Sequence, residues 1–147
     1  DFLNPLDMPA ALNDYCRKIG QKPPESKAAM VRALLESLAL KYRRVIDQLR
    51  QVLGHPIEKI HVIGGGSRNE LLCQFTANAT GLAVIAGPAE ATAIGNILVQ
   101  AMAMGHVSSP AEMRAIIRES FELRTYEPAD TAAWDAAYAR FRNVLAA

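Results

Sequence analysis

The hydrophobic positions of this chain follow helical spacing over most of its length. The longest such pattern begins at Ser26 and ends near Leu53, with Gly54 as its stop. Its apolar positions step by four and three, and they are Val31, Leu35, Leu38, Tyr42, Val45, Leu49 and Val52. This stripe predicts the inward face of a long helix, although a coiled-coil seam has the same signature. Because the opposite side is also partly apolar, we favour a helix packed on a sheet and on a neighbour.

The centre of the chain predicts a strand, a helix, a second strand and a second helix. A mostly apolar run over residues 57–63 predicts a strand that is covered on both faces. Residues 69–80 have the pattern of a helix that Gly81 ends, and its predicted inward side chains are Leu71, Leu72 and Phe75. A short apolar strand over 82–87 and a helix over 88–105 follow. This order is typical of an α/β layer with a parallel pair of strands.

Further helices flank this centre on both sides. Asp7 caps a predicted helix that Gly20 ends, and Ser109 opens a capping box that continues to Glu112. Residues 121–128 read as extended chain before a last helix, whose apolar side holds Trp134, Tyr138, Phe141 and Leu145. The segments between these elements are too short to separate domains, so 147 residues predict one unit.

Three consecutive glycines, Gly64–Gly66, join the first predicted strand to its helix. Unpaired N–H groups and the helix dipole favour an anion at such a place, and glycine lets a phosphate or ribose approach the main chain. A tight turn that needs positive φ would explain one glycine, whereas three favour a ligand. The loop is not a P-loop, since no GK[ST] follows, and Asn69 stands where a Rossmann loop has its third glycine.

Composition excludes several classes of function. Sixteen basic and 15 acidic residues nearly cancel, so charge gives no reason to expect nucleic acid or an anionic membrane as partner. We see no membrane span and no signal peptide, and the chain does not begin with Met, so we expect a piece of a longer protein. Two distant cysteines predict buried free thiols and a cytoplasmic location. The three histidines lack metal spacing, so no metal site is expected.

The segment "IHVIGGGSRNELLCQFTANATGLAVIAGPAEATAIGNILVQA" resembles the C-terminal region of the FGGY sugar kinases. "FLNPLDMPAALNDYC", "IGQKPPES" and "ESLALKYR" resemble that region in the same order. The resemblance implies an α/β fold: a partial actin-like (ribonuclease-H-like) domain with a parallel strand–helix–strand–helix core and additional flanking helices. Residues 1–147 would be the later part of the C-terminal, ATP-side domain. The N-terminal part of the same kinase would be the partner that completes the site.

The same resemblance implies a nucleotide site at the glycine loop. Gly65 is the first candidate to contact the adenosine and α-phosphate of ATP, flanked by Gly64 and Gly66, and Asn69 would reach the adenine or ribose edge. Ser67 and Arg68 are weaker candidates that equally fit plain loop surface. Mg²⁺ would arrive with the nucleotide and be held mainly by the rest of the kinase.

The implied reaction transfers the γ-phosphoryl group of ATP to the primary hydroxyl of a ketose, with L-rhamnulose first and fuculose or xylulose as alternatives. The family's catalytic aspartate precedes this region, and Asp7, Asp47 and Asp130 read as helix caps or as a solvated helix face. We therefore expect no catalytic residue here, a sugar pocket outside the chain, and no activity from the chain alone. A non-catalytic interaction module, with the glycine turn serving only as structure, stays open.

Overall fold

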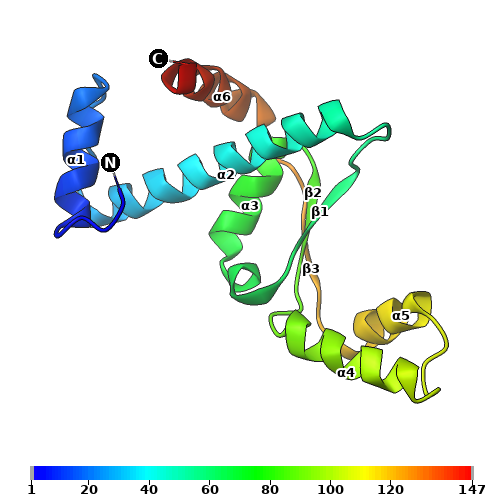
Figure 1. Ribbon diagram of the computed structural model, residues 1–147. Helices are drawn as coiled ribbons and strands as arrows, with labels where there is room; N and C mark the ends of the chain where they lie inside the picture. Colours follow the sequence, from blue (N-terminus) through cyan, green and yellow to red (C-terminus); the bar gives the residue numbers. More distant parts are fainter. Residues whose placement is uncertain (1, 147) are drawn as a thin grey trace.

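The computed structural model describes residues 2–146, and a three-stranded sheet lies at its centre (Figure 1). β1 (Lys59–Val62) and β2 (Ala83–Ala86) are parallel, as the strand–helix–strand pattern predicts. β3 (Arg124–Tyr126) pairs antiparallel with β2, so the strand order is β1-β2-β3 and β1 lies at one edge. The extended tail of the sequence thus adds a third strand to the predicted pair.

Six α-helices and one 3₁₀-helix surround the sheet in the described residues. They are α1 (Met8–Lys18), α2 (Lys27–Val52), η1 (Gly64–Arg68), α3 (Glu70–Thr80), α4 (Ala91–Ala103), α5 (Pro110–Ser120) and α6 (Thr131–Ala146). The predicted side-chain caps form, because Asp7 and Ser26 each accept a hydrogen bond from an N–H in the first turn of their helix. The strand–helix–strand–helix core and the flanking helices agree with the predicted α/β class.

One hydrophobic cluster joins the sheet to α3. Ile60, Val84 and Tyr126 lie opposite one another across the three strands and share a face. Val84 and Ala86 are buried against Cys73 and Ala77 of α3. Because alternate side chains of β2 point to the same face, Val84 and Ala86 together form the surface on which α3 packs. This packing also fixes the position of the loop before α3.

A second cluster joins α2, α3 and α6. Its buried members are Ala39, Leu40, Phe75, Ala79 and Tyr138, and Trp134 packs its ring against Phe75 with centroids 5.2 Å apart. The last helix presents the predicted aromatic side to this cluster, although Leu145 remains 48% exposed. α3 is therefore the element that both clusters share.

The long stripe of α2 does not form the inward face that its spacing predicts. Val31, Val45, Leu49 and Val52 are exposed, and the buried residues of the helix are Ala39 and Leu40. α2 crosses α3 through its middle, so only a short part of its length is covered (Figure 1). The prediction fails because spacing reveals an apolar face but does not reveal where a partner crosses it.

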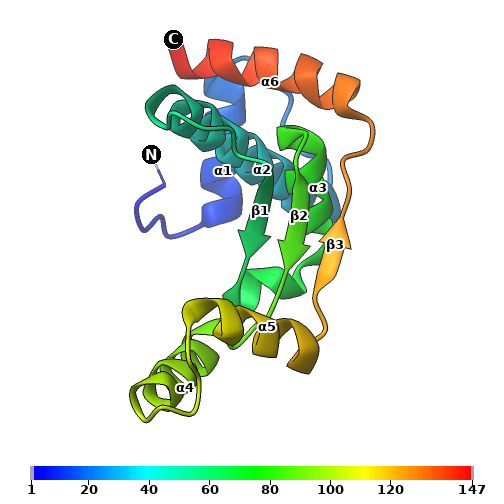
Figure 2. The same cartoon turned by 90° about the vertical axis from the view of Figure 1, so that its right-hand side faces the viewer.

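The sheet is likewise covered on one face rather than two. Lys59 and His61 of β1 are exposed, whereas Ile60 and Val62 are partly buried. Figure 2 looks onto the face that no described helix covers, with α2 and α3 behind the strands. In α3, Phe75 points inward as predicted but Leu71 is 47% exposed.

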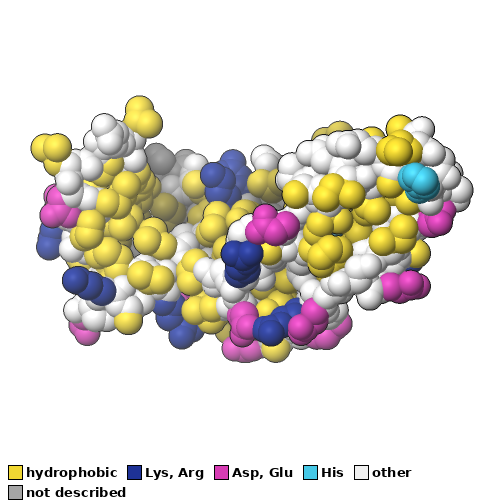
Figure 3. All heavy atoms as spheres, turned by 90° about the horizontal axis from the view of Figure 1, so that it is seen from below, with side chains coloured by type: hydrophobic (Ala, Val, Ile, Leu, Met, Phe, Trp, Pro, Cys, Tyr) yellow, Lys and Arg dark blue, Asp and Glu magenta, His cyan; other side chains and the backbone are white. Residues whose placement is uncertain are grey.

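α4 and α5 extend from the end of the sheet where β1 and β2 finish (Figure 1). α4 contains no charged residue, yet Ile97 and Val99 are exposed along it and Met104 just after it. Seen from below, hydrophobic side chains gather over this end and over the end formed by α1 (Figure 3). None of the described helices is both long and apolar enough to cross a membrane.

Candidate functional site at the ends of β1 and β2

The loops that follow β1 and β2 lie side by side, because parallel strands finish at the same edge of the sheet. The N–H of Gly87 donates to the Val62 carbonyl at 2.8 Å, and the N–H of Gly64 donates to the Pro88 carbonyl at 3.3 Å. In open α/β sheets ligands bind outside the carboxyl ends of the strands. The geometry therefore brings the glycine loop to the position where a ligand site is expected.

The glycine loop is a 3₁₀-helix rather than an open turn. Of its three glycines, only Gly64 has a positive φ, +74°. The Ser67 hydroxyl donates to the Gly64 carbonyl at 2.7 Å and closes the turn. A Cβ built on Gly65 would meet nothing within 4 Å, and one on Gly66 would only touch Val62 at 3.8 Å. Within this loop, therefore, the backbone conformation requires glycine at position 64 alone, and the other two glycines keep the space beside the loop open.

The main chain of Gly65 presents an unused donor to that space. The first N–H groups of a helical turn have no partner inside it. That of Gly64 is taken by Pro88, while that of Gly65 makes no hydrogen bond within residues 2–146. Gly65 is also exposed. An acceptor from outside the chain can reach this N–H without displacing anything.

Asn69 is the N-cap of α3. Its Oδ1 accepts the Leu72 N–H at 3.0 Å, and its carbonyl accepts the Cys73 N–H. Its side-chain NH₂ group makes no hydrogen bond in the described part of the chain and is exposed. The structure thus leaves Asn69 as a donor, because the cap already occupies its acceptor.

Cys73 lies directly beneath the loop. Its Sγ is 3.9 Å from the Gly66 carbonyl and 4.0 Å from the Ser67 carbonyl, and the residue is 1% exposed. Burial raises the pKa of this thiol, and the neighbouring Glu70 carboxylate raises it further. The free thiol predicted from the sequence is therefore a packing residue under the loop, while the other free cysteine, Cys16, is only half-buried.

A pocket of about 310 Å³ opens between the two loops and β3. Ser67 and Arg68 line it from the glycine loop, and Gly87 and Ala89 line it from the second loop. Gly87 has a φ of +108°, which favours glycine, and a Cβ there would also lie 3.3 Å from the Leu123 side chain and 3.4 Å from the Glu122 carbonyl. The pocket borders the second half of the glycine loop rather than Gly65 itself.

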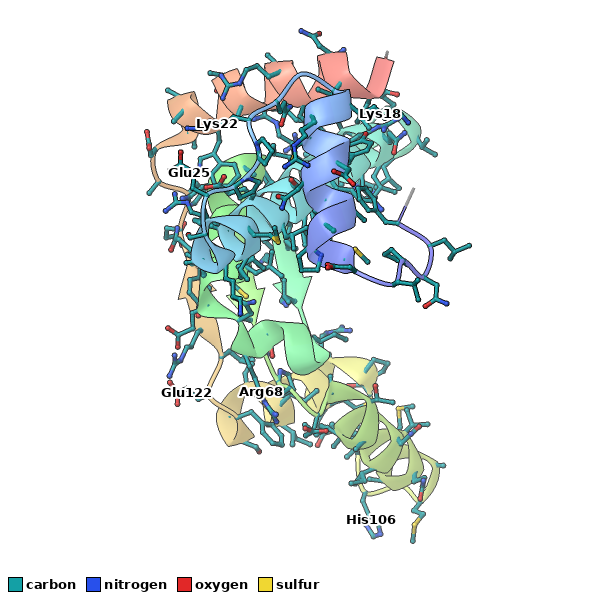
Figure 4. All side chains as sticks on the ribbon, turned by 90° about the vertical axis from the view of Figure 1, so that its left-hand side faces the viewer. Lys18, Lys22, Glu25, Arg68, His106 and Glu122 are labelled. Carbon is teal, nitrogen blue, oxygen red and sulfur yellow. The ribbon has the colours of Figure 1, made fainter. Side chains whose placement is uncertain are left out.

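The charges around this pocket are paired with one another. Arg68 binds Glu90 with 3.0 Å between Nη2 and Oε1. Arg124 binds Glu70 and Glu122, and these carboxylates raise the pKa of its guanidinium, Glu70 most. Figure 4 shows Arg68 and Glu122 at the same end of the sheet, above α4 and α5. The lining of the pocket therefore has no net positive charge, and an anionic ligand would have to be bound by hydrogen bonds.

Sequence reasoning finds the glycine loop and Asn69 but misses the wall opposite them. Arg124, Glu122 and Tyr126 reach the pocket because β3 pairs with β2, and no local pattern reveals that pairing. Gly87 and Ala89 belong to the "AGPAE" segment, which is part of the stretch that resembles the FGGY sugar kinases. That resemblance could have indicated that these two residues belong to the site. Residues 2–146 contain no group of three side chains suited to hold a metal ion.

Comparison with known proteins now identifies the chain. A family model described as the FGGY family of carbohydrate kinases, C-terminal domain, matches residues 1–104. The chain belongs to this FGGY family. Both strand-end loops of the candidate site lie within the matched residues.

Curated relatives of this FGGY chain include three named rhamnulokinase. That of Bacteroides thetaiotaomicron is 56% identical over 144 residues, covering 98% of this chain and 30% of the relative. That of Klebsiella pneumoniae subsp. pneumoniae is 42% identical, covering 86% and 26%, and that of Bacillus subtilis is 41% identical, covering 88% and 27%. The chain thus spans less than a third of the length of these relatives.

Among solved structures, the FGGY chain resembles the xylulose kinase from Rhodospirillum rubrum. The TM-score is 0.65 at 24% identity, and the match covers 86% of this chain and 26% of that one. This likeness concerns the fold alone. It confirms the predicted partial actin-like α/β fold.

Proposed function

We propose that this chain is the later part of the C-terminal, ATP-side domain of a kinase. The kinase transfers the γ-phosphoryl group of ATP to the primary hydroxyl of L-rhamnulose and yields L-rhamnulose 1-phosphate. The family membership and the relatives named rhamnulokinase, at 41–56% identity, support this assignment. Because the chain spans under a third of those relatives, the activity belongs to the longer protein, and its N-terminal part is the required partner.

Within that kinase, the glycine loop forms the seat for the adenosine and α-phosphate of ATP. The observation that carries this role is the exposed, unpaired Gly65 N–H beside open space at the carboxyl ends of two parallel strands. Gly64 and Gly66 flank it, and the side-chain NH₂ group of Asn69 donates to the adenine or ribose edge. An anionic oxygen accepting a main-chain N–H is a strong type of hydrogen bond.

The remaining chemistry comes from outside this chain. Phosphoryl transfer needs Mg²⁺ on the phosphates and a carboxylate that accepts the hydroxyl proton. The carboxylates nearest the loop, Glu70, Glu90 and Glu122, are each bound to an arginine. Mg²⁺ therefore binds with the nucleotide and is held by the rest of the kinase, as is the sugar. Two free cysteines support a cytoplasmic location for the whole protein.

The decisive test of the seat is Gly65→Val in the full-length natural protein. The valine side chain fills the open space beside the free N–H, so the KM for ATP should rise about tenfold or more, equivalent to about 1.4 kcal/mol of binding. The KM for the sugar should not change. Gly54→Val is the matched control, because Gly54 also meets nothing within 4 Å and precedes β1 at the opposite end of the strand.

An unchanged KM for ATP in Gly65→Val would show that the glycine loop is not the nucleotide site. A substrate panel on the same protein tests the sugar separately, with L-rhamnulose expected ahead of fuculose and xylulose. If the protein binds neither ATP nor ADP in calorimetry although it is folded, the alternative of a non-catalytic interaction module is favoured instead.

A further inference from the structure

A second pocket lies between the C-terminal half of α2 and α6. Its volume is about 530 Å³, within the range of ligand pockets. Three arginines line it, Arg44 and Arg50 from α2 and Arg142 from α6. It stands apart from the glycine loop, because α2 and α6 lie beyond the opposite end of the sheet (Figure 1).

Within the described residues, the acidic side chains offset only part of the positive charge of this pocket. Asp47 is the carboxylate of its lining, and it accepts the Tyr138 hydroxyl at 2.8 Å and faces Arg50 at 3.5 Å. Neither Arg44 nor Arg142 forms an ion pair within residues 2–146. Two guanidinium groups on different helices thus line one pocket, and neither has an ion-pair partner in the part of the chain that the structure describes.

Tyr138, which lines the pocket from α6, is held in place by contacts with α2. Tyr138 is 8% exposed and anchored to Asp47, and burial first and that hydrogen bond second raise its pKa, so it stays an uncharged donor at neutral pH. Arg43 stacks over the Tyr138 ring, 4.3 Å from its centroid, while binding Asp135 at 2.6 Å. Asp135 of α6 is therefore already paired with Arg43. The contacts of Arg43 and Tyr138 hold α2 and α6 together beside Arg44 and Arg142.

We infer that this pocket binds a phosphate group, either as free phosphate or on a small phosphate monoester. Arginine matches the oxygens of phosphate with paired hydrogen bonds, and two arginines supply two charges for a dianion. Gln48 and Gln51 add uncharged amide donors to the same lining. This site is independent of the proposed nucleotide seat.

The test is calorimetric titration of the full-length natural protein with inorganic phosphate, at fixed ionic strength. The double variant Arg44→Gln/Arg142→Gln should weaken phosphate binding about a hundredfold or more, because it removes both charge-assisted contacts to the phosphate oxygens. Arg140→Gln is the matched control, because Arg140 is an exposed arginine of α6 outside the lining. Gly65→Val should leave phosphate binding unchanged, which separates this site from the glycine loop.

Two further arms identify the source of the phosphate. Glycerol 3-phosphate binding more tightly than inorganic phosphate would assign the site to monoesters, and the reverse order would assign it to the free ion. Both surface substitutions remove exposed side chains, so a thermal melt of the double variant should match that of the control. Equal phosphate affinity in the double variant and the parent, or no binding by the parent, would overturn the inference.

Discussion

Arg68 of η1 and Glu90, which precedes α4, form an ion pair with 3.0 Å between Nη2 and Oε1. The pair bridges the loop after β1 to the loop after β2. Both side chains are more than two-thirds exposed, so the pair contributes little to folding. The pair instead holds the loop after β1 at a fixed distance from the loop after β2.

Breaking this pair should therefore change nucleotide binding more than stability. We expect Glu90→Gln to cost less than about 1 kcal/mol of unfolding free energy. In the full-length protein the KM for ATP should rise while kcat stays constant, as expected when a contact acts equally on ground and transition states. Glu36→Gln breaks the exposed Arg32–Glu36 pair of α2 and serves as control. Identical ATP kinetics in both variants would deny the bridge a positioning role.

The glycines of η1 should separate into one required by the fold and one required by the ligand. Gly64→Ala places a Cβ on a residue at φ +74° and should cost about 1–2 kcal/mol in urea unfolding. Gly65→Ala meets open space at an ordinary φ, so stability should stay the same or rise slightly. A larger loss for Gly65→Ala than for Gly64→Ala would contradict the described loop.

The two cysteines should react at different rates with an alkylating reagent. Cys73 is 1% exposed, and burial followed by Glu70 raises its pKa, so little thiolate forms and little of it is reachable. Cys16 is half-buried in α1 and should be modified first at pH 8. Mass spectrometry of timed digests measures the order. Addition of urea should equalise the two rates, and equal rates in native buffer would show that Cys73 is accessible.

The start of α5 should respond to acid through Glu112. Hydrogen bonds from the Ser108 side chain and main chain lower the pKa of this carboxyl group. A carboxyl whose pKa is depressed on folding adds stability above its ordinary value near 4.5, and that stability is lost as the pH falls through the folded value. Glu112→Gln should remove this part of the pH dependence in chemical unfolding, whereas Glu119→Gln, at the other end of the helix, should retain it.

Removal of the cap itself should weaken the same helix at all pH values. The Ser109 hydroxyl accepts the Glu112 N–H at 3.2 Å, and Ser109→Ala should cost about 1 kcal/mol of unfolding free energy. Ser108→Ala is the informative comparison, because it removes only the hydroxyl that binds the Glu112 side chain. If the two variants lose the same stability at neutral pH, the cap has been assigned to the wrong serine.

Local patterns predicted most of the elements and the position of the glycine loop between β1 and α3. Helix spacing, caps and stop glycines placed α2 and α3 within a few residues, because those signals depend on neighbours in the chain. The proposal of the glycine run and Asn69 as a nucleotide site depends on the same kind of local signal and stays a prediction. The sequence could not reveal that only Gly64 adopts a positive φ. The three glycines are identical, and they differ only in the φ that the turn imposes on each.

Features that depend on distant partners were not predicted. Nothing local indicates that Arg124 returns beside Glu70, 54 positions away. The inward face of α2 was misjudged because Leu40, on the weaker apolar side, meets α3 and α6. Leu35 of the regular stripe packs against the same cluster, but most of the stripe is exposed: Val31, Tyr42, Val45, Leu49 and Val52. An amphipathic period reports that a side prefers burial, and tertiary packing decides which side obtains it.

β1 hydrogen-bonds to β2 on one side only, and no strand of residues 2–146 takes the other side of Lys59–Val62. A row of free N–H and C=O groups on such a strand is a template for further strands. We expect copies of this chain produced alone to pair along that row and to aggregate. If the proposed function is right, co-expression with the rest of the longer protein should keep the material in solution by covering this edge.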